Sequence, residues 1–258
     1  MKIAYDGTAF HGQARQPGLR TVEGEVIHAL QRARVIRDPR AARFQSASRT
    51  DRGVSALGNV VAFDAALAAD AAVRAFNGKA QGVWGWSATS VPPDFNARRA
   101  VTRWYRYLLP PTHSADGLNS ILRLFEGEQD FHNFTKDRSR TRARIDMARA
   151  SREANRVIVD FRGPSFRWNL VRRLVAASIQ GEKGDASVAE IRAALEARGR
   201  VDFGLAPAEP LILMDVEYDF PLQRVNDPTA ISRVRRLLEE RTRAVEFLEL
   251  LRPRVEGV

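Results

Sequence analysis

A polar loop between two apolar-alternating segments is the feature that most constrains this chain. The segments, 44–47 and 59–63, predict short β-strands. The loop contains one acid, Asp51, between two arginines, and Gly53 suits a sharp turn soon after it. A loop held by two strands can orient a carboxylate toward a ligand. For the loop taken alone, an Asp that hydrogen-bonds within its own turn is the ordinary interpretation.

The loop is one of a series of motifs, and the order of these motifs along the chain is more informative than the loop alone. Ser48-Arg-Thr-Asp-Arg-Gly-Val54 resembles the Gly-Arg-Thr-Asp-x-Gly-Val signature of the tRNA pseudouridine synthase A family. Further segments are similar to that family and follow in its order: Tyr5-Asp-Gly-Thr-Ala-Phe10, Arg15-Gln16, Thr21-Val22, Pro93-Asp-Phe-Asn-Ala-Arg98, Arg103-Trp-Tyr-Arg-Tyr107, Asp130-Phe-His-Asn-Phe134, Phe166-Arg-Trp-Asn-Leu-Val-Arg-Arg173 and Leu211-Ile-Leu-Met-Asp-Val-Glu-Tyr218. Together they cover residues 1 to about 220, and the chain is identified by resemblance as a member of this family.

Four departures from the family pattern concern RNA selection. Ser48 replaces a usual Gly, Ser55 stands where His is common, and Gly12-Gln-Ala replaces Gly-Trp-Gln. Trp168-Asn169 replaces a paired His. None of them removes a residue to which a catalytic role is assigned below.

The resemblance implies an α+β pseudouridine synthase fold, with two similar mixed sheet-and-helix domains packed around a central basic cleft. Pro110-Pro111 is the best candidate boundary in the chain. We therefore expect an N-terminal catalytic domain at 1–109 that carries the Asp loop. A C-terminal domain at 110–258 would complete the cleft. No sequence repeat links the two halves.

Hydrophobic periodicity predicts mixed strands and helices in both halves. The first half contains expected strands at 1–5, around Trp84 and Trp86, and at 103–108, with helices after Thr21 and at 68–76. The second half opens at 122–125 and contains aromatic packing at 130–134, a strand at 155–161, a helix at 165–179 ended by Gly181, a helix capped by Ser187 and Glu190, and a strand at 211–218. In the strand at 103–108, Tyr105 and Tyr107 share one face.

A final helix is expected from about 227, where Asp227-Pro228 supplies a cap and a first-turn proline. Its apolar residues line one face. Docking of this face on its own domain is the favoured interpretation. A dimer contact is the alternative, because the resembling family forms homodimers.

The charge balance favours a polyanionic partner. The 258 residues carry 41 Lys and Arg, most of them Arg, against 31 Asp and Glu, a net charge of +10. Nucleic acid is therefore favoured over a membrane surface. With no Cys and only four scattered His, neither a disulfide nor a metal centre is expected. We find no signal peptide and no membrane-spanning run, so a cytoplasmic protein without a membrane partner is expected.

Two sets of basic residues are candidates for RNA contact. Lys136, Arg138, Arg140, Arg142 and Arg144 occupy every second position. In an extended segment these charges would form one row, like the phosphates of an RNA backbone. A solvated basic loop is the alternative. Arg15, Arg49 and Arg52 are the other candidates, and in the resembling family the arginine equivalent to Arg49 helps to hold the target nucleotide out of the stack.

Three residues carry the expected chemistry. Asp51 would act as nucleophile, or as stabiliser of positive charge developing at C1′ of the target ribose. The family motifs assign Arg172 as the cationic partner that offsets burial of this carboxylate. Tyr105 would stack on the uracil and relay the C5 proton. This isomerisation requires no metal, cofactor or small-molecule cosubstrate.

We therefore expect a tRNA pseudouridine synthase, with the anticodon arm as target inferred from the family. A catalytically silent tRNA-binding protein on the same scaffold is the alternative. A metal nuclease would need clustered acids, and a methyltransferase a Gly-rich strand-turn-helix; neither is found.

Overall fold

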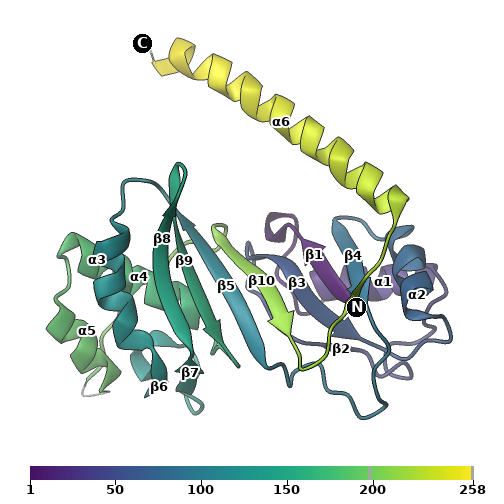
Figure 1. Ribbon diagram of the computed structural model, residues 1–258, viewed down its shortest axis with the longest axis horizontal. Coiled ribbons are helices and arrows are strands. Elements are labelled where there is room, and N and C mark those ends of the chain that lie inside the picture. The colour runs from purple at the N-terminus through teal and green to yellow at the C-terminus, as the bar shows by residue number, and fades with distance from the viewer. Residues whose placement is uncertain (197–198, 257–258) are drawn as a thin grey trace.

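The computed structural model describes residues 1–196 and 199–256. It shows an α+β fold built on one nine-stranded sheet (Figure 1). The strands of this sheet are β1 (Lys2–Tyr5), β2 (Gln45–Ser46), β3 (Ser55–Ala62), β4 (Val83–Ala88), β5 (Thr102–Leu109), β8 (Met147–Glu153), β9 (Arg156–Gly163), β10 (Leu211–Glu217) and β11 (Gln223–Arg224). A separate antiparallel pair consists of β6 (Gly127–Asp130) and β7 (Arg142–Ile145).

The sheet runs through both halves of the chain. Its strand order is β11-β4-β1-β3-β10-β5-β9-β8, and β2 pairs with β3. β3 and β10 are parallel, whereas the other neighbours are antiparallel. Because β10 comes late in the chain and lies between β3 and β5, the C-terminal half supplies a central strand beside the Asp51 loop.

All helices except α6 form two groups, which Figure 1 shows at opposite ends of the sheet. The helices are α1 (Val22–Arg32), α2 (Ala69–Asn77), α3 (Ala115–Leu122), α4 (Leu170–Lys183), α5 (Val188–Leu195) and α6 (Pro228–Glu256). α2 packs against β4 and α1, while α3 packs against β8 and α4. One hydrophobic core continues under both groups, from Ile3 in β1 through Leu213 in β10 to Phe161 in β9.

Local signals in the sequence predict several of these boundaries correctly. The Thr21 hydroxyl accepts a hydrogen bond from the backbone N–H of Gly24 at the start of α1. Ser187 and Glu190 form the predicted capping box of α5. Tyr105 and Tyr107 both lie on the buried face of β5. Each signal involves residues within one turn or one strand, so a local pattern is sufficient.

The bounds predicted for α4 were wrong at both ends. The helix begins five residues later than expected, because Asn169 has a left-handed backbone (φ 62°) directly before it. It continues through Gly181 and ends at Gly184, whose φ is 79°. A Cβ on Gly181 would lie 2.7 Å from the Ile121 side chain. This glycine therefore permits close packing of α3 on α4 and does not end the helix.

The helix α3 was not predicted from the sequence. The segment that opens the second half, 122–125, is the last residue of this helix followed by a 3-10 turn, Arg123–Phe125. The Ser114 hydroxyl accepts from the N–H of Gly117 and caps the helix. Eight residues give only two turns of apolar periodicity, too few for a clear helical pattern.

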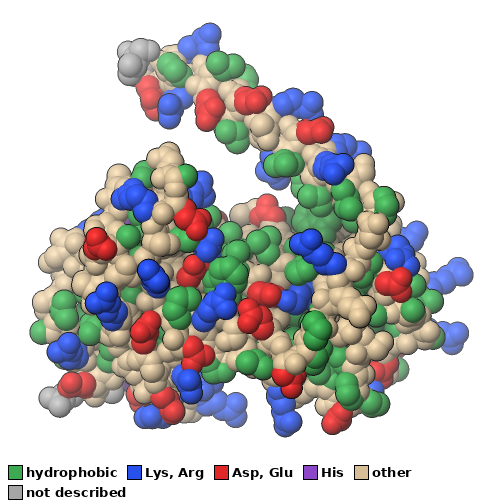
Figure 2. Space-filling view, viewed as in Figure 1, with side chains coloured by type: hydrophobic (Ala, Val, Ile, Leu, Met, Phe, Trp, Pro, Cys, Tyr) green, Lys and Arg blue, Asp and Glu red, His purple; other side chains and the backbone are tan. Residues whose placement is uncertain are grey.

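The preference for a docked C-terminal helix was also wrong. α6 projects from the rest of the molecule and contains no buried residue (Figure 1). Its beginning is attached where Arg233 donates to the carbonyl oxygens of Asn77 and Ala80. Apolar and charged side chains along it are open to solvent on the face seen in Figure 2. Across the described ranges, α6 included, no helix has the length and apolarity needed to cross a membrane.

Candidate active site

Residues from both halves of the chain line one large cleft. Its volume is about 1290 Å³. The lining includes residues of the segments 11–23, 44–54, 96–105 and 165–172. Asp51, Tyr105 and Arg172 all lie on this lining, so the structure brings the three predicted catalytic residues to one site.

An ion pair joins the two halves within the cleft. Arg172 Nη1 donates to Asp51 Oδ2 at 3.1 Å, although 121 positions separate the two residues. Arg172 Nε also donates to the carbonyl oxygen of Ala206 at 2.8 Å, which orients the guanidinium. The Arg172 side chain is 14% exposed and that of Asp51 is 29% exposed. Within the described residues Asp51 Oδ1 has no hydrogen bond, so this oxygen remains free to meet a substrate.

Tight backbone packing holds the Asp51 loop. Gly53 has φ 88°, a conformation that L side chains rarely adopt. A Cβ on Gly7 would lie 2.1 Å from the carbonyl oxygen of Val54, so the turn after β1 contacts the loop directly. The Ser55 hydroxyl accepts from the Gly7 N–H at 3.0 Å. These contacts leave the loop little freedom to move.

A network of buried polar groups also holds the Asp51 loop in place. The Tyr5 and Thr50 hydroxyls are 2.9 Å apart. Asn59 Nδ2 donates to the Tyr5 hydroxyl at 3.2 Å and to the Ser48 carbonyl oxygen at 2.9 Å. Burial raises the pKa of Tyr5 to about 12, so its hydroxyl stays protonated at neutral pH and remains a donor. The network connects β1 and β3 to the residues on either side of Arg49.

Arg103 is a further residue of this site, one that sequence reasoning did not assign. Its guanidinium donates to Ser48 Oγ at 2.9 Å, to the carbonyl oxygens of Ala47 and Arg98 at 3.0 Å each, and to that of Pro164. It has no carboxylate partner among the described residues. Burial lowers the pKa of the guanidinium from its ordinary value. Arg103 therefore ties the Asp51 loop to the segment that leads into α4.

A sequence signal for Arg103 existed. The residue occupies the same face of β5 as Tyr105 and Tyr107, where alternation predicts burial. A charged side chain at a buried strand position must find several hydrogen-bond partners, because an unpaired buried charge is costly. The pattern could identify such a residue, but it could not name the partners.

Tyr105 contributes an aromatic wall with a free hydroxyl. The residue is 7% exposed, and its ring makes an edge contact with Phe166 at a centroid distance of 5.1 Å. Its hydroxyl has no hydrogen-bond partner in the described part of the chain. Burial, with contributions from Tyr5 and Asp51, raises the pKa of the phenol above its ordinary value. The group is therefore a neutral phenol at physiological pH.

The arginines beside Asp51 are available for a ligand. Arg49 and Arg52 are exposed and line the cleft. Among residues 1–196 and 199–256 neither has an acidic partner, and the neighbouring Asp51 pairs with Arg172 instead. Arg15 is also exposed, but it lies outside the lining and its Nε is 3.4 Å from Glu23 Oε1.

The predicted basic row is exposed but only partly extended. Lys136, Arg138, Arg140, Arg142 and Arg144 are all exposed. Only Arg142 and Arg144 lie on a strand, β7, where they share a face. Both have acidic neighbours, Glu128 at 3.4 Å and Asp146 at 2.6 Å respectively. The single row that a fully extended segment would give is therefore not formed, because the chain is irregular between Lys136 and Arg140.

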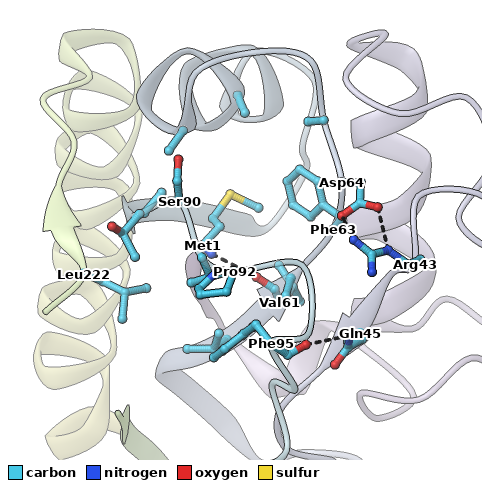
Figure 3. Close-up of a pocket in the computed structure, with 18 of the residues that line it drawn as sticks. Met1, Arg43, Gln45, Val61, Phe63, Asp64, Ser90, Pro92, Phe95 and Leu222 are labelled. Carbon is cyan, nitrogen blue, oxygen red and sulfur yellow. Dashed lines mark hydrogen bonds and ion pairs between the residues drawn. The ribbon is translucent and has the colours of Figure 1, made fainter. Parts of the chain in front are cut away.

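A second, smaller cavity of about 400 Å³ holds none of the predicted catalytic residues (Figure 3). Three of its polar side chains, Arg43, Asp64 and Gln45, are already paired. Arg43 forms an ion pair with Asp64 at 2.6 Å, and Gln45 Nε2 donates to the Phe95 carbonyl oxygen at 3.2 Å. The larger cleft, which contains unpaired arginines and a free carboxylate oxygen, is the better candidate for a polyanionic substrate.

Comparison with known proteins identifies relatives of this chain over nearly its whole length. A family model described as tRNA pseudouridine synthase matches residues 121–219. The tRNA pseudouridine synthase A of Methanothermobacter thermautotrophicus is 37% identical over 259 residues, covering 98% of this chain and 92% of that protein. Proteins of the same name from Pyrococcus abyssi and Methanococcoides burtonii are 40% and 39% identical. These two matches cover 94% and 91% of this chain and 92% and 88% of the relatives.

Among solved structures, one titled as a Cbf5-Nop10-Gar1 complex matches with a TM-score of 0.36 and 10% identity, over 69% of this chain and 43% of that chain. The sequence relatives define the class of protein, an isomerase that acts on tRNA. The chain belongs to the tRNA pseudouridine synthase A family. The expected family and the α+β fold class are thereby confirmed.

Proposed function

We propose that this protein isomerises uridines in the anticodon arm of tRNA to pseudouridine, with Asp51 as nucleophile or as stabiliser of charge at C1′. The observation that carries the proposal is the Asp51–Arg172 pair in a cleft built from both halves, with Tyr105 on the same lining. The arm itself is inferred from the family. Wild-type activity on tRNA transcripts, followed by mapping of the modified positions, tests the proposal.

The reaction moves one bond and conserves all atoms of the base except one exchanged hydrogen. The N1–C1′ bond breaks, the uracil rotates, and a C5–C1′ bond forms. The C5 hydrogen then leaves as a proton, and N1 gains one. Asp51 Oδ1 is the free carboxylate oxygen that can attack or stabilise the electrophilic carbon, while Arg172 stays paired with Oδ2.

The target nucleotide must leave the RNA stack before this chemistry can occur, because a stacked base hides both C5 and the glycosidic bond. We assign the unpaired Arg49 to holding the extruded nucleotide, since it lies two positions from Asp51 on the cleft lining. Arg52 and the more distant Arg15 would contact neighbouring phosphates.

Tyr105→Phe should separate stacking from proton transfer. The variant keeps the ring and its contact with Phe166 but removes the hydroxyl. We expect the rate of conversion at saturating tRNA to fall by about 10²- to 10⁴-fold, the usual contribution of a positioned acid or base, with tRNA affinity unchanged. Single-turnover kinetics measure this, and Tyr105→Leu serves as the variant that loses both roles. Full activity of Tyr105→Phe would exclude the proton-relay role.

The basic residues from Lys136 to Arg144 are proposed to follow the RNA backbone. Replacing Arg138, Arg140 and Arg142 by Ala should weaken tRNA binding at moderate salt. The slope of log affinity against log salt should become shallower by about 2, because three phosphate contacts are lost. A triple variant at the exposed residues Arg32, Arg37 and Arg40 removes the same charge away from the cleft. Equal slopes for the two triple variants would contradict the proposal that this segment follows the RNA backbone.

The larger organisation is also a proposal. The protein would act in the cytoplasm as a homodimer, with domains 1–109 and 110–258 on either side of the cleft. The exposed apolar residues of α6, among them Leu238 and Leu248, would contact a second copy. A sedimentation velocity profile that remains monomeric with α6 intact would argue against the dimer.

A further inference from the structure

Trp168 is the one exposed tryptophan among the described residues. The proposed steps of the reaction assign it no role, although it lies in the cleft. Of the four tryptophans, the other three are partly covered, whereas Trp168 is 56% exposed. It lies on the cleft lining next to Phe166 and Asn169. Exposing so large an aromatic surface to water costs free energy, so its place beside the active site calls for a ligand.

The backbone of Trp168 is held firmly. Its N–H donates to Asp137 Oδ2 at 3.2 Å. Its carbonyl oxygen accepts from the Thr135 hydroxyl at 3.0 Å and from the Lys136 N–H at 3.1 Å. The next residue, Asn169, has a left-handed backbone that turns the chain into α4. The indole is therefore presented from a rigid turn.

The surroundings of the indole match a nucleotide. Lys136 Nζ lies 5.2 Å from the ring centroid, so a cation is placed beside an aromatic face. Because the ammonium lies over the ring, a base that stacks on this face would displace it toward the phosphate of the same nucleotide, and an aromatic ring with a neighbouring cation is the combination that binds single-stranded RNA. The indole Nε1 has no hydrogen-bond partner in the described ranges. It is thus also free to donate to the RNA.

The size of the cleft indicates that more than one nucleotide enters it. Pockets for a single small molecule measure about 300–1,000 Å³. This cleft measures about 1290 Å³, and Trp168 lines it together with Asp51. We propose that Trp168 is a stacking platform for a nucleobase adjacent to the extruded uridine. This inference rests on the proposed function and adds to it a residue that binds the flanking RNA.

Affinity for a tRNA transcript tests the platform without relying on catalysis. Trp168→Ala should weaken binding by about 5- to 100-fold, the usual effect of removing one base–aromatic stack. Trp168→Phe should stay within about threefold of wild type, because it keeps a ring beside Lys136. Equal affinities of wild type and Trp168→Ala would overturn the proposal. A loss in Trp168→Phe as large as that in Trp168→Ala would also overturn it, since it would indicate a structural role.

A double-mutant cycle with the RNA identifies the base. The target uridine is mapped first, and transcripts with an abasic residue on its 5′ or 3′ side are then bound to wild type and Trp168→Ala. On one of them the substitution should cost no further affinity, because the stack is already gone. Additive losses on both transcripts would overturn the assignment to a flanking base.

Catalytic measurements separate the two proposals. Trp168→Ala should raise KM and leave kcat near the wild-type value, because stacking of a flanking base is made in ground and transition states alike. A kcat loss with unchanged KM would overturn the platform. If wild type itself converts no uridine, the proposed function fails, and the binding experiment still decides whether Trp168 stacks on a base.

Discussion

Asp51→Asn is expected to abolish pseudouridine formation, lowering the rate by about 10⁴-fold or more, the scale seen when a central catalytic group is removed. The amide has nearly the same shape as the carboxylate and can still accept from Arg172, so the 3.1 Å contact should survive. It is a poor nucleophile and carries no charge to stabilise a cationic sugar. Binding of tRNA should be kept. Single-turnover conversion and filter binding measure the two quantities.

A matched control exists on the same lining. Glu23 is another acid of the cleft, and Glu23→Gln removes the same charge without touching the Asp51 loop. Its conversion rate should remain within about tenfold of wild type. Comparable losses in the two variants would mean that the cleft needs negative charge in general, and the specific role of Asp51 would be wrong.

Arg103→Met is expected to have the largest effect on stability. Methionine fills similar space, but the carbonyl oxygens of Ala47, Arg98 and Pro164 lose their donor. Each buried group left unpaired costs about 1–3 kcal/mol, so the free energy of unfolding should fall by about 3 kcal/mol. Conversion should fall as well, because Arg103 ties the Asp51 loop to the segment before α4. Denaturant unfolding and single-turnover kinetics together measure both effects.

The exposed Arg99 provides the comparison for Arg103. It has no ion pair or side-chain hydrogen bond in the described part of the chain, and it does not line the cleft. Arg99→Met should change the free energy of unfolding by less than about 0.5 kcal/mol. If Arg103→Met changed the free energy of unfolding equally little, the hydrogen bonds of the Arg103 guanidinium would not be what holds the Asp51 loop.

Much of this site was predictable because its signals are local. Alternation placed Tyr105 and Tyr107 on one face of β5, and the turn around Gly53 placed Asp51 on a loop between strands. The Asp51–Arg172 pair spans 121 positions, so no local pattern could show it, and it was expected only from the family motifs. Arg49 and Arg52 were predicted as candidates for RNA contact, but their lack of acidic partners among the described residues needed coordinates.

The failures have physical causes. Phe166 fits the apolar stripe of α4 by spacing, yet it lies before the helix and contacts Tyr105 instead. Gly181 resembles a helix terminator, but its small size serves packing against α3. The apolar stripe of α6 predicts that another surface covers it. The pattern alone cannot distinguish a surface of its own domain from a second copy of the chain. In each case tertiary contacts decide between interpretations that the local pattern leaves equal.

The most direct test of the central claim is release of tritium from tRNA transcript labelled at uridine C5. Pseudouridine formation must expel that hydrogen by whatever route the chemistry takes. The account predicts release by wild type and none by Asp51→Asn, with both proteins binding the transcript. If neither protein released tritium from any of several tRNAs that it bound, the chain would be a tRNA-binding protein without this activity.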